Sequence, residues 1–478
     1  MLFHSLTFGI FFSIFMVCYV LARRFGVHRY VFLVFSNCFY GWWDWRFLGL
    51  VWVTILTDFH VAKLVGSLQG VRLRRVALAV SLVVNLSILG FFKYWNFFID
   101  SLPRLGIHGG QSLHLANLVL PIGISFYTFQ SMSYVIDVYR NKFEPVTNLL
   151  DYACFVTWFP QLVAGPIERC RHLLPQIKAP SPITPARIFS GVFWFACGFY
   201  QKGVGDALAL FSDPIFADLQ SAQPEQVVAA IIGFGGQIYC DFCGYSLMAL
   251  GLSRIVGIDL IWNFRAPYLA TSIRQFWRRW HISLSNWLKD YLYISLGGSL
   301  KGASNTVRNL MLTMTICGLW HGAGWNFVAW GFLHGLFLLL SRPLGKASGL
   351  LISWSALLRP LIVLAGSFLT LASVFYAWLY FRCPTIEMCL EANHKIGEWI
   401  LQPKLPAFSG YLLLALLPVL SLDVFFARSG KNGDAADTRT AFSGFQITAL
   451  GCASALFFGM GLVLFAGRPT QQFIYFQF

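Results

Sequence analysis

Long apolar runs follow one another along almost the whole chain of 478 residues. A helix of about 20 apolar residues crosses the ~30 Å hydrocarbon core of a bilayer. The pattern therefore predicts an all-α integral membrane protein that forms one polytopic domain over residues 1–478. We expect about twelve spans, at residues 5–22, 30–47, 48–66, 76–98, 118–136, 188–211, 227–252, 307–322, 324–341, 352–381, 408–427 and 443–466.

Two further stretches are apolar but make poor spans. Residues 147–167 contain Pro160, Gly165 and Pro166, and such helix breakers at membrane depth indicate a re-entrant segment that lines a cavity. Residues 273–298 mix Arg, Trp, Lys and Asp with Leu and Ile, which predicts an amphipathic, half-buried segment on the cytoplasmic side.

The composition agrees with a membrane protein. Hydrophobic residues make up 57% of the chain and charged residues 12%, about half of the charged share that soluble proteins carry. This balance excludes a cytosolic enzyme, a disordered protein and a secreted disulfide scaffold. Cys240 and Cys243 form a C-x-x-C pair, but they lie in an apolar run without a second pair and give little support for a metal or redox site.

The remaining charges predict an orientation. Lys and Arg number 35 against 20 Asp and Glu, and such an excess gathers in the cytoplasmic loops of membrane proteins. Arg23 and Arg24 follow the first run, which places the amino terminus outside. Twelve crossings then place the carboxyl terminus outside as well. The loops then placed inside carry Arg72, Arg74, Arg75, Arg140, Lys142, Arg274, Arg278, Arg279, Arg342, Lys346, Arg428, Lys431 and Arg439. The loops placed outside carry Asp213, Asp218, Glu225, Glu387, Glu391 and Glu398.

Ionisable groups at membrane depth cost ~2.5–3.5 kcal/mol or more and are candidates for function. Asp241 lies within the expected span 227–252, where a hydrogen bond between helices is the simpler interpretation. His281 and His321 are stronger candidates. His321 lies between two short spans with Trp320 beside it, and a neutral imidazole in an apolar pocket suits general-base catalysis. From the residues alone, however, a lone histidine beside an apolar span is more often a satisfied polar contact than a catalytic group.

Other motifs are weaker. His334 follows His321 by thirteen residues, which is not a spacing that puts two side chains on one helix face. The chain has neither the G-x-S-x-G of serine hydrolases nor the zinc motif H-E-x-x-H, so we expect no metal.

Five strings resemble the membrane-bound O-acyltransferase family, and most closely its alginate O-acetyltransferase-like bacterial branch, which is related to the D-alanyl transferase of teichoic acid synthesis. They are LPIGISFYTFQSMSYVIDVYR (120–140), FPQLVAGPIERC (159–170), YCDFCGYSLMALGL (239–252), FWRRWHISLSNWLKDYLYISLGG (276–298) and GLWHGAGWNFVAWGFLHG (318–335). The resemblance implies a ring of tilted transmembrane helices around a central funnel. Around Asp241 the family pattern D-F-S-G-Y-S-D-M-A is altered, because Cys243 and Leu247 replace a serine and an aspartate, and this puts the polysaccharide in doubt.

The resemblance also implies roles for particular residues. His321 matches the family histidine, and His281 matches a second family residue on the cytoplasmic approach. Asp241, Trp320 and Asn326 would line the cavity. The implied donor is a thioester, acyl-CoA or an acylated carrier protein, and no bound cofactor is implied. Residues placed to bind it are Arg274, Arg278, Arg279, Trp280 and Lys289, although the same cations could hold lipid head groups.

The last twelve residues, 467–478, form an expected extracytoplasmic tail that ends in FIYFQF. This ending resembles the F-x-Y-x-x-F tail of the same branch, in which the tyrosine carries the acyl group. Tyr475 would then be a third catalytic residue, because a phenol is a nucleophile that a neutral histidine can deprotonate. The alternative is an aromatic anchor at the membrane interface.

Together these expectations describe an acyltransferase of the bacterial inner membrane. It would move an acyl group, most simply acetyl, from a cytoplasmic thioester to an extracytoplasmic SGNH-type partner that O-acylates a polysaccharide. One alternative is D-alanyl transfer from a carrier protein to a cell-wall polymer. A lipid-linked sugar transporter and a non-catalytic docking subunit are alternatives of another class, although transporters usually show internal repeats that are not evident here.

Overall fold

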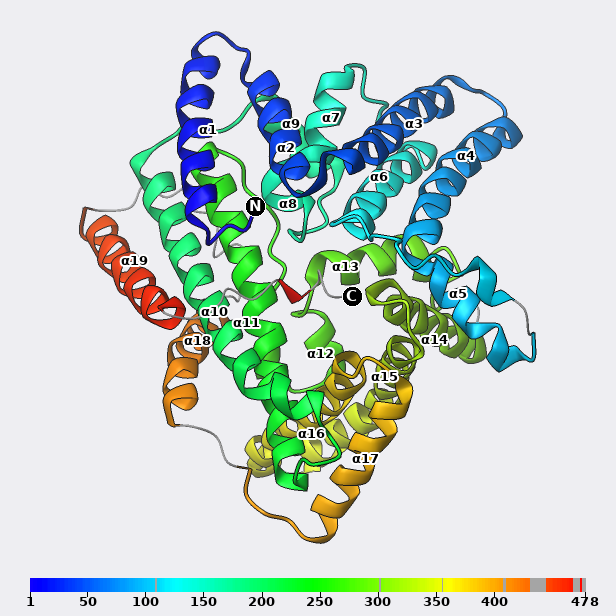
Figure 1. Ribbon diagram of the computed structural model, residues 1–478, viewed down its shortest axis with the longest axis vertical. Helices are drawn as coiled ribbons and strands as arrows, with labels where there is room; N and C mark the ends of the chain where they lie inside the picture. The colour runs from blue at the N-terminus through cyan, green and yellow to red at the C-terminus, as the bar shows by residue number, and fades with distance from the viewer. Residues whose placement is uncertain are drawn as a thin grey trace. The chain divides into compact units, whose positions relative to one another are not determined.

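The computed structural model describes residues 1–107, 110–300, 302–354, 356–406, 410–429, 444–466 and 473–474. Every regular element in these ranges is a helix, so the all-α prediction is confirmed there (Figure 1). Tyr475 lies outside the described residues, as do most of the expected tail and the loop residues Lys431 and Arg439.

Seven helical stretches of the described chain are long and apolar enough to cross a membrane. They are Leu6–Arg24, His28–Ser67, Val71–Ser101, Pro224–Val256, Trp325–Gly345, Arg359–Arg382 and Thr448–Phe465. The other expected spans coincide with helices outside this group, which are α6 (Ile124–Tyr139), α10 (Pro185–Ala217), α14 (Gly302–His321) and α18 (Gly410–Ser429). The protein is therefore a multi-pass helical membrane protein, and the number of twelve crossings stays a prediction.

The chain divides into two compact units, of which the first comprises Met1–Phe195 and Tyr245–Ile261. Its helices before α10 are α1 (Leu6–Arg24), α2 (His28–Asp44), α3 (Leu48–Ser67), α4 (Val71–Leu89), α5 (Trp95–Ser101), α6, α7 (Leu149–Thr157), α8 (Phe159–Leu162) and α9 (Cys170–Lys178). Helices α3 and α4 are joined by a buried polar contact, because Asp58 accepts hydrogen bonds from Ser81 (2.6 Å) and Asn85 (3.0 Å). Such interhelical hydrogen bonds hold helices together where lipid supplies no hydrophobic drive.

Residues 147–167, expected to form a re-entrant segment, are divided between two helices. Helix α7 ends before Trp158, whose ψ of 107° turns the chain, and α8 begins with Pro160 in its first turn. Residues 151–170 are all buried, and the carbonyl oxygen of Phe155 at the end of α7 accepts hydrogen bonds from Gln130 (2.7 Å) and Gln161 (3.2 Å). Irregular backbone at membrane depth requires this kind of burial and pairing. Whether the segment re-enters one membrane face stays a prediction.

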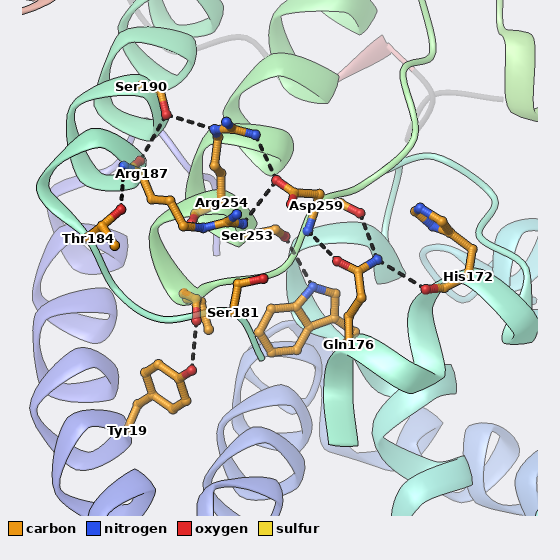
Figure 2. A network of polar contacts seen from close by, with 12 residues as sticks. Tyr19, His172, Gln176, Ser181, Thr184, Arg187, Ser190, Ser253, Arg254 and Asp259 are labelled. Carbon is orange, nitrogen blue, oxygen red and sulfur yellow. Dashed lines mark hydrogen bonds and ion pairs between the residues drawn. The ribbon is translucent and has the colours of Figure 1, made fainter. Parts of the chain in front are cut away.

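A polar network in the same unit fixes the chain where α11 (Pro224–Val256) ends (Figure 2). Asp259 pairs with Arg254 at 2.7 Å and with Arg187 at 3.0 Å, and its backbone nitrogen donates to Gln176 at 2.8 Å. Figure 2 shows these side chains converging from α9, α10 and α11 on the loop that follows α11. The network thus anchors the start of the segment that leads to His281.

Glu168 adds a second anchor to this loop. Its buried carboxylate accepts the backbone N–H of Ile261 at 2.7 Å and contacts Nδ1 of His172, also at 2.7 Å. The hydrogen bond from His172 to this carboxylate raises the pKa of His172, because the bond favours the protonated imidazole. His172 lies on α9, outside the apolar stretches.

The second unit comprises Ala196–Gly244 and Trp262–Phe478. Helices α10 and α11 contribute to both units. The further helices of this unit are α12 (Ile273–Trp277), α13 (Ile282–Trp287), α14, α15 (Trp325–Trp354), α16 (Arg359–Arg382), α17 (Ile386–Leu401), α18 and α19 (Gly444–Phe465). Figure 1 shows α14, α15 and α16 grouped together, and α15 packs against both of its neighbours.

Two helical segments of this unit differ from the predictions. The expected loop between spans 324–341 and 352–381 is helical, because α15 continues past Pro343 to Trp354 and α16 begins only at Arg359. The residues after 341 include Ser, Arg, Lys and Ala, which are less apolar than the leucines and phenylalanines before them. Arg, Lys and Ala nevertheless favour a helix, so the helix continues beyond the end of the apolar run. Helix α17 was also not expected; the hydroxyl of Thr385 caps it by accepting from the N–H of Met388.

Small residues bring α10 and α11 into close contact within the second unit. A Cβ atom on Gly244 would lie 2.7 Å from the carbonyl oxygen of Gly198, and one on Gly205 would lie 3.0 Å from the nitrogen of Asp241. Glycines at such positions let two helix backbones approach closely in a membrane. This approach allows Lys202 on α10 to reach Asp241 on α11.

Candidate active site

His281 and His321 lie together inside the second unit, with their ring centroids 6.3 Å apart. We call them the histidine pair. His321 is the last residue of α14, and His281 directly precedes α13. Both side chains are buried, with exposed fractions of 0% and 3% for His281 and His321. The prediction singled out both residues, and the fold brings them together across forty positions of sequence.

His281 holds an unusual backbone conformation. Its φ of 41° is in the left-handed region, which residues with a Cβ seldom adopt. Asn263 secures the turn: its carbonyl oxygen accepts the N–H of Ile282 at 2.9 Å, and its side chain accepts the hydroxyl of Ser283 at 2.6 Å. Strained backbone that is fixed by its surroundings is common at functional sites.

Aromatic rings surround the histidine pair. His281 lies against Phe242, with centroids 4.7 Å apart, and His321 lies against Trp320 (4.9 Å), Trp330 (5.0 Å) and Phe381 (5.3 Å). His281 lies outside the seven helical stretches that are long and apolar enough to cross a membrane. Burial lowers the pKa of His281 to about 3. Because desolvation disfavours the imidazolium, His281 is neutral near pH 7 and can accept a hydrogen bond.

The hairpin of α14 and α15 sets the position of His321. A Cβ atom on Gly331 of α15 would overlap the carbonyl oxygen of Met314 on α14, and one on Gly318 would overlap the carbonyl oxygen of Phe327. The two backbones therefore meet one turn before His321, and only glycine fits at these crossing points.

Replacing Gly331 with alanine should push α14 away from α15 and displace His321. Overpacking of this kind costs about 1–3 kcal/mol, so we expect a lower melting temperature of the purified protein together with reduced acyl transfer. Gly345 lies on the same helix with open space around it, and Gly345→Ala is the matched control. Equal melting temperatures for the two variants would contradict this account of the hairpin.

His334 is closer to the pair than its spacing in sequence indicates. Its ring is fully buried and packs on Trp330 (4.7 Å) and Trp277 (5.1 Å), and Trp330 also contacts His321. His334 stays a weaker candidate, but its spacing from His321 in sequence does not decide how far apart the two residues lie. His321 and His334 lie on different helices, so the rule for residues on one helix face does not apply to them.

The three residues expected to line the cavity lie in different surroundings. Trp320 forms part of the aromatic wall beside His321. Asn326 is buried and donates its side-chain N–H groups to the carbonyl oxygens of Tyr380 (3.2 Å) and Cys383 (2.9 Å), which ties the start of α15 to the end of α16. Asp241 pairs with Lys202 at 2.7 Å, in agreement with the expected contact between helices.

Lys202 and Asp206 were missed by the sequence reasoning. Lys202 lies 2.6 Å from Asp206 and 2.7 Å from Asp241, and all three side chains are almost fully buried. We call these three residues the buried cluster. A Lys and an Asp four residues apart inside the expected span 188–211 were the available signal, since such charges at membrane depth are costly.

The residues expected to bind the donor separate into surface and interior positions. Arg274, Arg278 and Lys289 are exposed, whereas Arg279 is half-buried and donates to the carbonyl oxygen of Ala266 at 3.2 Å. Trp280 is fully inside, where it packs on Trp378 with centroids 4.9 Å apart. Residues 273–298 thus carry exposed cations and buried aromatic rings, and their placement at the cytoplasmic side of the membrane stays a prediction.

The C-terminal segment also reaches the interior of this unit. Phe473 and Ile474 are buried, and the backbone N–H of Ile474 donates to Asp241 at 2.6 Å. The ring of Phe473 contacts Phe242, which in turn contacts His281. Tyr475 follows directly in the chain but lies outside the described residues.

Comparison with known proteins places these features in a family. The sequence model of the membrane-bound O-acyltransferase family matches residues 38–348, which include both members of the histidine pair. A protein of Pseudomonas aeruginosa named probable alginate O-acetylase is 40% identical over 77% of this chain and 70% of its own length. Its namesake in Azotobacter vinelandii is 36% identical over 93% of this chain and 94% of its own. The peptidoglycan O-acetyltransferase of Helicobacter pylori is 35% identical, over 74% and 71% of the two chains.

These similarities decide between the classes of protein considered from the sequence. A family match over more than half of the chain, together with relatives that cover two thirds or more of it, shows an acyltransferase, so the interpretation as a sugar transporter is wrong. The chain belongs to the membrane-bound O-acyltransferase family and is an acyltransferase embedded in the membrane.

Proposed function

We propose that this protein takes an acyl group, most simply acetyl, from a cytoplasmic thioester and passes it to an extracytoplasmic SGNH-type partner. That partner would O-acylate a polysaccharide outside the inner membrane. The observation that carries the proposal is the histidine pair, enclosed by aromatic rings and joined by contacts to the buried C-terminal segment. The names of the relatives support acetyl as the group and a polysaccharide as the final acceptor.

The chemistry assigned to the site is a balanced exchange of a thioester for an ester. The phenol oxygen of Tyr475 attacks the thioester carbonyl carbon while His321 takes the phenol proton. The C–S bond breaks, the thiolate leaves, and the proton returns to it as the free thiol. The product is a phenyl ester, which is an activated acyl donor for a hydroxyl acceptor. His281 stays neutral and contributes hydrogen bonding within the enclosed site.

The exposed cations on the segment around His281 support a negatively charged donor. Arg274, Arg278 and Lys289 are exposed positions of residues 273–298, the segment in which Trp280 and His281 lie buried between α12 and α13. Phosphates of coenzyme A or the acidic surface of a carrier protein would be attracted to such a surface. We place this surface at the cytoplasmic face and both termini outside, as the loop charges predict.

Reconstitution in vesicles tests the proposal. Purified protein is supplied with radiolabelled acetyl-CoA, and we expect release of free thiol together with an acetyl adduct on Tyr475, located by mass spectrometry of the C-terminal peptide. A D-alanylated carrier protein serves as the second donor and reports the alternative reaction. Failure of every thioester to release thiol would contradict the proposed function, whereas thiol release without an adduct would remove Tyr475 from the pathway.

A further inference from the structure

The buried cluster has an excess of negative groups. Lys202 is the one ammonium group that lies between the carboxylates of Asp206 (2.6 Å) and Asp241 (2.7 Å) within the cluster. The exposed fractions of Lys202, Asp206 and Asp241 are 2%, 6% and 3%. A buried carboxylate is costly unless ion pairs and hydrogen bonds compensate it. A further hydrogen-bond donor to one of these carboxylates lowers this cost.

The C-terminal segment supplies that donor. The backbone N–H of Ile474 donates to Oδ2 of Asp241 at 2.6 Å, while Oδ1 of the same carboxylate contacts Lys202. Each oxygen of Asp241 therefore has its own partner. Hydrogen bonds to an ionised acceptor are short and roughly twice as strong as neutral ones. This contact joins α11 to a segment that lies 233 positions further along the chain.

Aromatic packing places the held segment beside the histidine pair. Phe473 is fully buried with its ring 5.8 Å from that of Phe242, and Phe242 lies 4.7 Å from His281. The polar contact of Ile474 and the ring contact of Phe473 thus fix two successive residues from two sides. The next residue in the sequence is Tyr475, which lies outside the described residues.

We propose that Asp241 is a positioning residue, oriented by Lys202, that binds the peptide N–H of Ile474 and so presents the C-terminal segment to the histidine pair. The hydrogen bond itself does not depend on the acyl relay. Its consequence for catalysis rests on the proposed function, because only an acyl-accepting Tyr475 needs to be presented to His321. Lys202 contacts Oδ1 of Asp241, and Oδ2 of the same carboxylate accepts the N–H of Ile474.

Amide exchange in the Asp241→Asn variant tests the hydrogen bond. The ammonium of Lys202 and the N–H of Ile474 face different oxygens of Asp241, and asparagine keeps an acceptor at only one of these two positions and carries no charge. Loss of a hydrogen bond to a charged group corresponds to roughly a 10- to 100-fold shift in an equilibrium. We therefore expect hydrogen–deuterium exchange at the Ile474 amide of the full chain to accelerate on the order of 10- to 100-fold.

Asp423→Asn is the matched control for that variant. Asp423 is another buried acid of the second unit, with an exposed fraction of 3%, and it accepts a hydrogen bond from Tyr239 at 2.5 Å. Exchange at Ile474 should keep its wild-type rate in this control. Equal exchange rates at Ile474 in wild type and Asp241→Asn would overturn the proposal.

A second pair of variants leaves the buried cluster untouched, in case Asp241→Asn does not fold. Ile474→Pro removes the donated N–H and fixes φ of this residue, whereas Ile474→Val keeps the N–H. The readout is hydroxyl-radical oxidation of Phe473, measured by mass spectrometry, because this ring is fully buried when the segment is bound. We expect oxidation to rise about tenfold or more with proline and to stay unchanged with valine. Unchanged oxidation with proline would overturn the proposal.

The acetyl adduct on Tyr475 separates this proposal from the proposed function. We expect the Asp241→Asn and Ile474→Pro variants to form less acetyl adduct on Tyr475. The loss should be larger in the variant with the larger increase in Ile474 exchange or Phe473 oxidation. Release of the segment with a normal adduct would overturn the positioning role. A wild-type chain that protects the Ile474 amide but never forms an adduct would support the hydrogen bond and contradict the relay.

Discussion

Replacing His321 with glutamine should abolish acyl transfer in a protein that still folds and inserts into the membrane. General-base catalysis by a positioned side chain contributes about 10²- to 10⁴-fold to a rate, and glutamine cannot take a proton near pH 7. Glutamine is similar to histidine in size and stays polar, so Trp320, Trp330 and Phe381 keep most of their packing around it. The measurement is thiol release from acetyl-CoA by the reconstituted variant.

His28→Gln is the control for this prediction. His28 is also buried, with an exposed fraction of 8%, and contacts the carbonyl oxygen of Ile177 at 3.1 Å in the first unit. If losing any buried histidine impaired the enzyme, the two variants would behave alike. A His321→Gln variant that releases thiol at the wild-type rate would remove His321 from the reaction.

The helical fold was predictable because it depends on local composition. Apolar runs of about 20 residues select membrane helices. Pro160 at the start of α8 likewise indicated the interruption that follows α7. Predictions failed where hydropathy and helix formation diverge, as at Pro343 in the long helix α15 and in the amphipathic helix α17. The ring and central funnel implied by the family stay predictions.

The site was predictable only in part because its residues meet through tertiary contacts. No spacing rule joins His281 to His321: each was singled out by its own surroundings in the sequence, and it was the family resemblance that gave the two residues a shared role. The position of His334 was hidden in the same way. It lies near His321 only because Trp330, on the helix of His334, contacts both histidines. A periodic pattern describes one helix at a time, so contacts between helices remain outside its reach.

The buried cluster shows the same limit and also a missed signal. Lys202 and Asp206 were readable as two charges within an apolar span, whereas their link to Asp241 required the close approach of α10 and α11 at Gly205 and Gly244. The bond from Ile474 to Asp241 was not predictable, because nothing local marks two residues 233 positions apart as partners.

Replacing Tyr475 with phenylalanine should reduce the rate of acyl transfer to the extracytoplasmic partner at least about 100-fold. Phenylalanine keeps the ring but has no oxygen to carry the acyl group. Mass spectrometry of the C-terminal peptide should then show no adduct, and labelled acetyl should not reach the polysaccharide. The result separates the relay from an interfacial anchor, since phenylalanine keeps the aromatic ring that an anchor needs.

Three substitutions at Tyr475 make this comparison complete. A relay requires the phenol, so phenylalanine, tryptophan and alanine should all eliminate transfer to the partner. An anchor requires an aromatic ring, so phenylalanine and tryptophan would keep transfer and alanine alone would reduce it. The Ile474 amide should stay protected from exchange in the phenylalanine variant, because Asp241 binds the backbone of the preceding residue. Protected exchange together with lost transfer would place the defect at the phenol oxygen, whereas normal transfer by the phenylalanine variant would exclude the relay.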